Sequence, residues 1–269
     1  MSDQYAAREA WDRYGPGYDA AFSSSFTPFA REALRLADVR PGMTLLDVAA
    51  GGGALSIPAA ELGADVLATD LSSGMLDLLH QRAEEAGVSG IRTKVMDGTA
   101  LALDDKTFDR VCSQFGVMLF PDPDAGLIEM HRVTAEGGRG VVVIFGRPER
   151  MVPVWLLGQA VQKALPDVEI PPGSRLMTDP MSLEEAMRSA GFEDVRLEIL
   201  DRSVRFGSAQ GLWRMMSSSA PGFAMLLERL PDEQREAVRD ALLQAAVERY
   251  GADFDELPVE VIVGLGQKG

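Results

Sequence analysis

The 269-residue chain is poor in the side chains that build metal sites and nucleic-acid surfaces. It has one cysteine and two histidines, which excludes an internal disulfide and argues against a soft-metal site, so we expect no bound metal. Lysine and arginine together number 26 against 41 aspartates and glutamates, and a net charge of −15 repels phosphate backbones and anionic lipid surfaces. We therefore predict neither nucleic acid nor a membrane as a partner.

Long apolar runs are also missing. No uninterrupted stretch approaches the roughly 20 residues needed to cross a bilayer, and the first residues lack the basic start and apolar core of a secretory signal. With 46% hydrophobic and 25% charged residues, the composition is typical of a globular domain. We expect one soluble, cytoplasmic domain over residues 1–269, and the sequence leaves open whether it forms a homo-oligomer.

Five β-rich runs alternate with helical patterns, an order typical of βαβ units around a parallel sheet. The runs are residues 43–49, 64–70, 91–96, 108–113 and 140–145. Between the second and third runs, apolar residues recur at helical spacing from Met75 to Ala86; Ser72 is a suitable N-cap and Gly87 ends the pattern.

The segments outside this core differ in character from it. The first forty residues are rich in aromatics and end in a predicted helix from Phe29 to Ala37, while proline and methionine after Phe145 indicate an irregular insertion. We expect hinges near residues 15–17 and at Gly207, where covering segments would close over the sheet. The predicted parts are a cover (1–40), a cofactor-binding core (43–146), substrate-covering insertions (147–185 and 208–255) and closing strands (186–207 and 256–269).

The most informative segment is 45–54, where an apolar strand containing Asp47 enters the loop 49–53, Ala-Ala-Gly-Gly-Gly. Glycines there let the backbone approach a ligand where a Cβ would collide. Asp70 ends the next strand, where a carboxylate can accept hydrogen bonds from both ribose hydroxyls of a nucleoside. Asp97 follows the third strand at the same edge. The alternatives are a tight turn for the glycines and helix capping for the two aspartates.

Four stretches resemble the class I S-adenosylmethionine-dependent methyltransferases, closest to the ubiquinone/menaquinone-biosynthesis type (methyltransferase type 11/25). They are LLDVAAGGGALSIPAAELGADVLATDLSSGML, KVMDGTAL, FDRVCSQFGVMLFPDP and EMHRVTAEGGRGVVVIFG. The resemblance covers about residues 11–146, and Ala190 to Val195 matches the family's last crossover. It implies an α/β, Rossmann-like fold: a seven-stranded, mostly parallel sheet with helices on both faces, an antiparallel last strand and helical lid insertions. It also implies S-adenosyl-L-methionine as the cofactor.

The resemblance places the methionine part of the cofactor against the first loop. It assigns Ala49, Ala50, Gly51 and Gly53 to that contact, with Asp47 supporting the loop. The family usually has glycine where this chain has Ala49. A methyl group is compatible with a negative φ, so we expect a slightly altered loop rather than lost binding.

The nucleoside is expected at the next two strand ends. By resemblance, Asp70 binds the ribose, Leu71 and Met75 flank the adenine, and Asp97 with Gly98 meets the adenine edge. A nicotinamide-dependent dehydrogenase is the rival interpretation, because the first loop loosely imitates the nicotinamide fingerprint. The aromatic lead-in and the Asp-Gly pair after the third strand argue against it.

Two more residues complete the expected cofactor site. The resemblance places Ser113, at the end of the fourth strand, near the methionine group and Tyr18 above the cofactor. Methyl transfer from a sulfonium needs collinear reactants and no nucleophilic side chain. We find no persuasive general base, because His80 and His131 are expected to be structural or exposed and Cys112 to lie in the core.

The acceptor site should use segments that the generic sheet does not explain. The candidates are Phe22, Gln114, Phe115, Met118, Trp155 and Trp213, and core packing is the alternative for each. We predict methyl transfer to carbon, oxygen or nitrogen of a hydrophobic or aromatic small molecule, such as a secondary metabolite or a quinone-like acceptor. The second hypothesis is a non-catalytic relative that binds the cofactor as a regulator or a cyclase-like helper, and transfer to a protein or nucleic acid is a third.

Overall fold

The strands expected from the sequence form one seven-stranded sheet in the order β3-β2-β1-β4-β5-β7-β6. The computed structural model describes residues 3–168, 174–219 and 221–269. β1 pairs in parallel with β2 and β4, whereas β7 runs antiparallel to β5 and β6, as predicted for the last strand. The strands are β1 Thr44–Val48, β2 Asp65–Asp70, β3 Ile91–Val95, β4 Phe108–Gln114, β5 Thr134–Phe145, β6 Glu193–Arg205 and β7 Glu256–Gln267.

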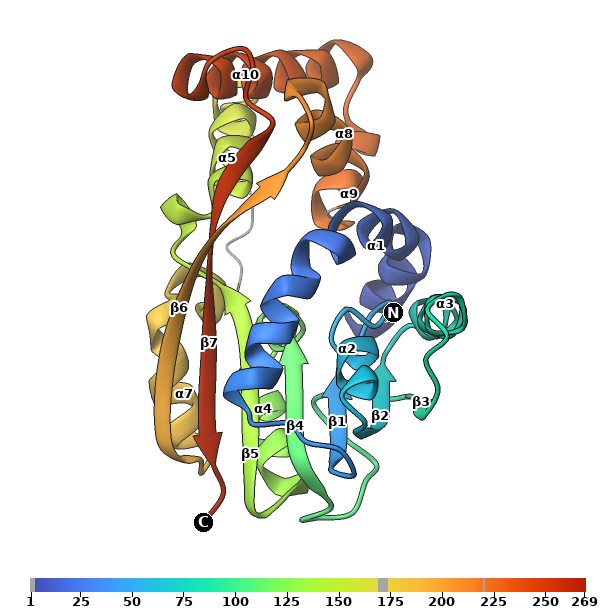
Figure 1. The fold of residues 1–269 in the computed structure, drawn as a ribbon. Helices are drawn as coiled ribbons and strands as arrows, with labels where there is room; N and C mark the ends of the chain where they lie inside the picture. Colours follow the sequence, from blue (N-terminus) through green and yellow to red (C-terminus); the bar gives the residue numbers. More distant parts are fainter. Residues whose placement is uncertain (1–2, 169–173, 220) are drawn as a thin grey trace.

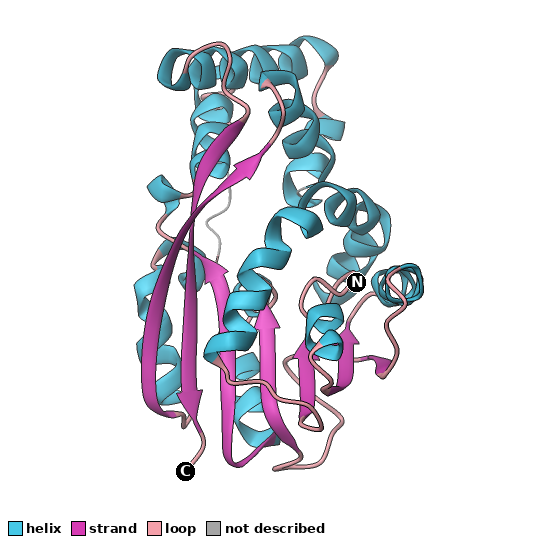
Figure 2. Cartoon of the chain, viewed as in Figure 1, coloured by secondary structure: helices cyan, strands magenta, loops and turns pink. Residues whose placement is uncertain are grey.

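Helices cover both faces of the sheet (Figures 1 and 2). On one face lie α1 Asp3–Leu36, α2 Ser56–Glu61 and α3 Ser73–Glu85, and on the other lie α4 Pro123–Val133 and α7 Leu183–Ser189. The start of α3 confirms the expected cap, because the Ser72 hydroxyl accepts a hydrogen bond from the Met75 N–H at 3.0 Å. Gly87 follows the helix with φ +67°, a conformation that favours glycine.

The core lies between the central strands and these helices. Val141 to Ile144 in β5 and Val261 to Val263 in β7 are fully buried, which fits strands covered on both faces. Cys112 in β4 is likewise fully buried, so the expectation of a core cysteine is confirmed.

The amino-terminal cover is one long helix rather than a partly helical segment. α1 continues through residues 15–17, and its ribbon changes direction as it passes over the sheet (Figure 1). Gly15 has a packing role there, since a Cβ on it would lie 2.2 Å from the sulfur of Met75. The glycine therefore permits α1 to approach α3, and hinge motion at this point stays a prediction.

The expectation of an irregular insertion after Phe145 was wrong. This segment contains α5 Val152–Ala164 and the short α6 Arg175–Thr178, together with the 3-10 turns η2 Pro148–Arg150 and η3 Pro180–Ser182. Pro153 stands in the first turn of α5, where proline begins a helix instead of breaking it. Residues 169–173 of the predicted insertion lie outside the described residues.

A group of helices stands beyond the carboxyl ends of the parallel strands, as expected of lid insertions (Figure 1). It consists of α5 with α8 Ala209–Ser219, α9 Pro221–Arg229 and α10 Asp232–Tyr250. Arg13 and Tyr14 of α1 connect to it by hydrogen bonds of 3.0 and 2.7 Å to Glu228. Within the described residues, no helix has the length and apolar character needed to span a bilayer.

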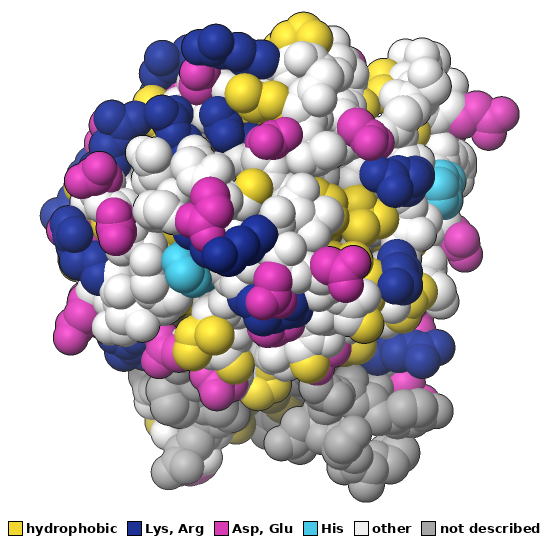
Figure 3. Space-filling view, turned by 90° about the horizontal axis from the view of Figure 1, so that it is seen from below, with side chains coloured by type: hydrophobic (Ala, Val, Ile, Leu, Met, Phe, Trp, Pro, Cys, Tyr) yellow, Lys and Arg dark blue, Asp and Glu magenta, His cyan; other side chains and the backbone are white. Residues whose placement is uncertain are grey.

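The face seen from below is mixed in charge. Figure 3 shows Lys and Arg side chains dispersed among Asp and Glu over that end of the molecule, which carries the amino ends of the parallel strands. The acidic excess therefore does not form a single-sign surface there.

Candidate functional site

A cavity of about 320 Å³ lies beneath α1, at the carboxyl ends of the parallel strands. Its walls come from α1 and from the loops that follow β1, β2, β3 and β4. Most of the residues assigned to the cofactor line it together: Tyr18, Asp47, Ala49, Ala50, Gly51, Asp70, Leu71, Met75, Asp97 and Gly98. Residues separated by up to eighty positions in the sequence thus meet at one edge of the sheet.

The loop after β1 has a left-handed backbone. Ala49 has φ +57°, so the expectation of a negative φ at this position was wrong. Two hydrogen bonds on the following residues accompany this shape: the Ala50 N–H donates to the Thr69 carbonyl and the Gly51 N–H to Asp70 Oδ2, both at 2.9 Å. The loop therefore continues the pairing with β2, and Ala49 adopts a conformation that costs an L residue about 1–2 kcal/mol.

Asp70 joins the first two loops of the site. Its Oδ2 accepts from Gly51 and its Oδ1 accepts from the Ser72 N–H at 2.9 Å. Burial raises the pKa of the Asp70 carboxyl above its ordinary value, and these backbone donors oppose that shift. The carboxylate lines the cavity as well as holding both loops, so the capping and binding interpretations are compatible.

Asp97 occupies the equivalent position after β3. One of its oxygens, Oδ1, accepts from the Thr99 N–H at 2.9 Å and from the Thr99 hydroxyl at 2.8 Å. These local bonds fix the carboxylate in a turn that faces the cavity.

Asp47 is the most deeply buried carboxylate of the cavity, with 1% of its surface exposed. Its Oδ2 accepts from the Ser56 hydroxyl at 2.6 Å, whereas Oδ1 is buried with no hydrogen-bond partner among the described residues. Burial raises its pKa from 3.8 to about 7; the Ser56 hydrogen bond opposes the shift and the negative charge of Asp70 adds to it. A positive charge in the cavity would stabilise the ionised Asp47 carboxylate.

α1 is attached to the loop after β1 by a buried ion pair that sequence reasoning missed. The Asp19 carboxylate accepts from the Ser23 hydroxyl and from Arg82 Nη1, the latter at 2.7 Å. Arg82 of α3 also donates to the Gly52 carbonyl at 2.9 Å. A Cβ on Gly52 would lie 2.1 Å from Asp19, so only glycine permits this contact. The sequence contained one indication of this contact. Asp19 and Ser23 directly follow Tyr18 and Phe22 and, like them, are four residues apart.

Two residues assigned to the cofactor do not line the cavity. Gly53 has φ +85° and packs so closely on Leu79 that a Cβ would lie 2.8 Å from its Cγ. The Ser113 hydroxyl donates to the Val48 carbonyl at 2.8 Å and accepts from the Val117 N–H at 3.3 Å. Both residues support the loops from behind.

The predicted acceptor residues divide in the same way. Gln114 and Phe115 line the cavity, whereas Phe22, Met118, Trp155 and Trp213 do not. Of the four that do not line it, Phe22 stacks on Phe26 and Met118 is buried in the core. Trp155 makes a cation–π contact with Arg249, and Trp213 makes an edge contact with Phe223.

Further residues line the cavity, and some of them belong to the aromatic lead-in and to the segment after the fourth strand, both expected to contribute to the acceptor site. They are Trp11, Asp19, Ser23, Phe26, Gly52, Ala54, Leu55, Met96, Thr99, Gly116, Leu119, Phe120, Pro121 and Asp122. Those after β4 belong to the turn η1 Val117–Leu119 and to the entry into α4. In the sequence, these residues could have been recognised as candidates because they follow a predicted strand.

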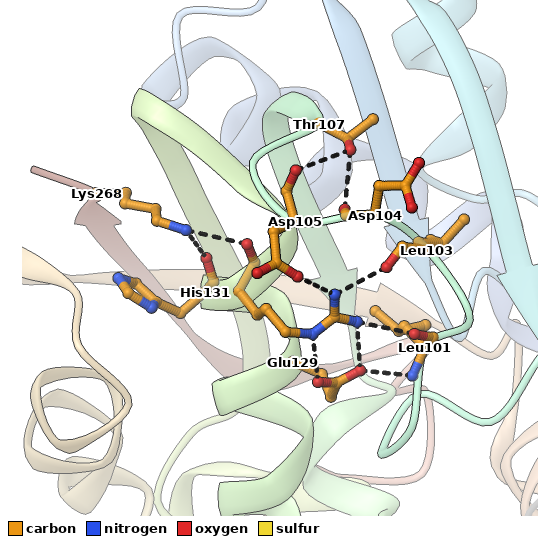
Figure 4. A network of polar contacts seen from close by, with 9 residues as sticks. Leu101, Leu103, Asp104, Asp105, Thr107, Glu129, His131 and Lys268 are labelled. Atoms are coloured by element: carbon orange, nitrogen blue, oxygen red, sulfur yellow. Dashed lines mark hydrogen bonds and ion pairs between the residues drawn. The ribbon is translucent and has the colours of Figure 1, made fainter.

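The histidines lie away from the cavity, as expected. The His131 ring makes an edge contact with Phe192, and Lys268 donates to the carbonyls of His131 and Arg132 (Figure 4). Arg132 also binds Glu129, and this network ties the end of α4 to the chain terminus. His80 is exposed and bonded to Thr93.

Comparison with known proteins agrees with this geometry. Residues 46–142 match the family model described as a methyltransferase domain. The chain is 30% identical to nocamycin O-methyltransferase of Saccharothrix syringae, over 87% of this chain and 88% of that protein. It is 32% identical to demethylmenaquinone methyltransferase of Paenarthrobacter aurescens, over 78% of this chain and 79% of that protein. The crystal structure of the [4+2]-cyclase SpnF shares the fold, with a TM-score of 0.62 at 17% identity, over 97% of this chain and 94% of that chain.

The fold and the position of the cavity at the carboxyl edge of the sheet fit a protein that binds a nucleoside cofactor. The chain belongs to the class I S-adenosylmethionine-dependent methyltransferases, of the ubiquinone/menaquinone-biosynthesis type. S-adenosylmethionine is its cofactor, and the cavity suits a molecule with a positive sulfonium and amino group. Five aspartates line it, one with an unpaired buried oxygen, and no Lys, Arg or His does so among the described residues.

The Asp19–Arg82 pair should contribute measurably to stability. The two side chains are 8% and 26% exposed, so Arg82→Met leaves a buried carboxylate without its counter-charge. We expect the free energy of unfolding in urea to fall by about 2 kcal/mol, allowing for partial solvent screening. The control is Arg92→Met, whose pair with Asp65 is 64% and 53% exposed, with an expected loss within about 0.5 kcal/mol. Equal losses in the two variants would contradict the assignment.

Asp70→Ala should weaken cofactor binding. The change removes the carboxylate assigned to the ribose and frees the N–H groups of Gly51 and Ser72, so we expect a loss of at least about 1.5 kcal/mol for S-adenosylhomocysteine by calorimetry. Asp65→Ala, at the exposed start of the same strand, is the control and should leave the dissociation constant unchanged. An unchanged constant in the Asp70 variant would refute its role.

Asp47 should make the ligand-free protein less stable as the pH rises. Between about pH 4 and pH 7 the unfolded chain releases the Asp47 proton while the folded chain retains it, so folding loses free energy as the pH rises through this window. Asp47→Asn removes this titration. We expect the variant to gain on the wild type by about 3 kcal/mol between pH 4 and pH 8, measured by urea unfolding without cofactor. A difference that stays constant with pH would rule out the raised pKa.

Proposed function

We propose that this enzyme transfers the methyl group of S-adenosylmethionine to carbon, oxygen or nitrogen of a hydrophobic or aromatic small molecule. The observation that carries the proposal is the composition of the cavity wall. The ends of β1, β2 and β3 contribute carboxylates, whereas the segment from Gln114 to Pro121 after β4 is uncharged and is followed by Asp122 at the entry into α4. One cavity thus combines an acidic wall suited to the cofactor with an apolar wall suited to an acceptor.

The residues of the chain would act by binding, orienting and excluding water. When bound, S-adenosylmethionine supplies a methyl group activated by the adjacent sulfonium. Asp70 would hold the ribose, Leu71 and Met75 would enclose the adenine, and α1 would close the site from above with Tyr18. Holding acceptor, methyl carbon and sulfur collinear is the main contribution a protein can make to such a displacement.

The relatives support a small-molecule acceptor. Their names describe an O-methyltransferase of nocamycin and a methyltransferase of demethylmenaquinone. The cavity supports the same class of acceptor, because it lies under α1 and between loops instead of in an open groove that would admit a polymer. Tyr18 and Phe26 lie on its α1 wall.

Transfer of a labelled methyl group tests the proposal. The purified protein is incubated with S-adenosylmethionine labelled in the methyl group and with a fraction of small metabolites extracted into organic solvent. We expect label in an organic-soluble product, and loss of it with Asp70→Ala. Absence of calorimetric binding of S-adenosylhomocysteine at tens of micromolar would sink the proposal. Tight binding without any transfer would favour a non-catalytic helper, and label in protein or nucleic acid would contradict a small-molecule acceptor.

A further inference from the structure

Asp19 of α1 is a buried carboxylate of the cavity with one oxygen left open. The residue lines the cavity, and only 7% of its surface is exposed. Its Oδ1 accepts hydrogen bonds from the Ser23 hydroxyl and from Arg82 Nη1. Its Oδ2 has no hydrogen-bond partner among the described residues and, unlike Oδ1 of Asp47, it keeps accessible surface. The small exposed part of Asp19 therefore includes a carboxylate oxygen that can accept a donor from a ligand.

The carboxylates at the strand ends are engaged by the protein itself. Both oxygens of Asp70 accept from backbone N–H groups, at 2.9 Å each. Asp47 gives one oxygen to the Ser56 hydroxyl at 2.6 Å, and its other oxygen is enclosed. Asp97 Oδ1 accepts two hydrogen bonds from Thr99. Asp19 differs from these residues because it comes from the covering helix and offers its open oxygen from that side.

Asp19 lies against the first loop of the site. A Cβ on Gly52 would lie 2.1 Å from Asp19 Oδ1 and 3.2 Å from Oδ2, so both oxygens are close to that glycine. Arg82 holds the arrangement, because it donates to the Gly52 carbonyl at 2.9 Å and to Asp19 at 2.7 Å. The loop 49–53 is the one assigned to the methionine part of the cofactor, and this part ends in an α-ammonium and a carboxylate.

The charges at this place suit such a zwitterionic group. An ammonium carries a positive charge and three N–H donors, so it can form a charge-assisted hydrogen bond to Asp19 Oδ2. Arg82, which binds the other oxygen, offsets the repulsion that Asp19 alone would exert on the carboxylate of the same ligand. The Asp19–Arg82 pair therefore favours the ammonium without rejecting the amino-acid group as a whole.

We propose that Asp19 is a cofactor-binding residue: its Oδ2 accepts a hydrogen bond from the α-ammonium of the methionine part of S-adenosylmethionine. Because Asp19 belongs to α1, this bond also ties the cover to the bound cofactor. The inference deepens the proposed function and rests on it, since it requires the methionine part to lie against the loop after β1.

Two analogues of S-adenosylhomocysteine, each lacking one group, test the contact. The desamino analogue lacks the α-ammonium, whereas the decarboxylated analogue keeps the ammonium and lacks the carboxylate. Dissociation constants for the full chain are measured by calorimetry at pH 7. We expect the wild type to bind the desamino analogue about ten- to a hundredfold more weakly than S-adenosylhomocysteine, the range of a charge-assisted hydrogen bond.

Asp19→Asn tests the residue itself. The amide keeps an acceptor oxygen for Ser23 and Arg82 and places an NH₂ group where Oδ2 stands. We expect the affinities for S-adenosylhomocysteine and for the decarboxylated analogue to fall at least about tenfold, whereas that for the desamino analogue does not fall. A change in stability or in loop shape would weaken all three ligands alike, so this pattern reports the contact with the ammonium.

Two control variants complete the design. Arg82→Met breaks the ion pair but leaves the Asp19 carboxylate in place, so the preference for S-adenosylhomocysteine over the desamino analogue should persist. Asp65→Asn makes the same chemical change at the exposed start of β2 and should leave all three dissociation constants as in the wild type.

The outcomes separate this inference from the proposed function. Equal binding of S-adenosylhomocysteine and the desamino analogue to the wild type, a preference that survives in Asp19→Asn, or one that is lost equally in Arg82→Met overturns the inference while the cofactor still binds. Failure of S-adenosylhomocysteine to bind the wild type overturns the proposed function itself.

Discussion

Five carboxylates line one cavity, and the buried ones need hydrogen bonds or positive charge to compensate for the loss of contact with water. Asp19 has Arg82, Asp70 has two backbone N–H groups and Asp122 has the N–H of Ala125 at the start of α4. Asp47 retains one unpaired oxygen. The architecture of the edge follows from this requirement, because the loops after β1 and β2 are held in place by the donors they give to Asp70. In the proposed site, a cationic cofactor would add positive charge beside these carboxylates.

The same requirement connects the cover to the sheet. Asp19 can be buried only because Arg82 reaches it from α3, and Arg82 also holds the Gly52 carbonyl. The Ser72 hydroxyl at the start of α3 donates to Asp12 of α1 at 2.5 Å. α1 thus contacts the two loops assigned to the cofactor, so the stability of the cover and the shape of these loops depend on shared residues.

The sequence predicted the sheet, and most of the residues that it assigned to the cofactor line one cavity, because both depend on local patterns. Alternating apolar runs placed β1 to β5, and a carboxylate at a strand end, such as Asp70, necessarily lies at the edge of the sheet. The Asp19–Arg82 pair was not predictable, since it joins residues 63 positions apart and depends on how α1 bends over the sheet. The sign of φ at Ala49 was mispredicted for a related reason: it is set by hydrogen bonds to β2, outside its own segment.

Fewer of the residues predicted for the acceptor line the cavity than of those predicted for the cofactor, and the packing of the helices explains the difference. Trp155 and Trp213 belong to helices beyond the edge, where residue type indicates burial but not the direction of the side chain. Gln114 was identifiable because a residue at the end of a central parallel strand has a fixed position, next to β1 and within reach of α1. Within this fold, the position of a binding residue is therefore predictable at the strand ends, whereas contributions from the covering helices require the packed structure.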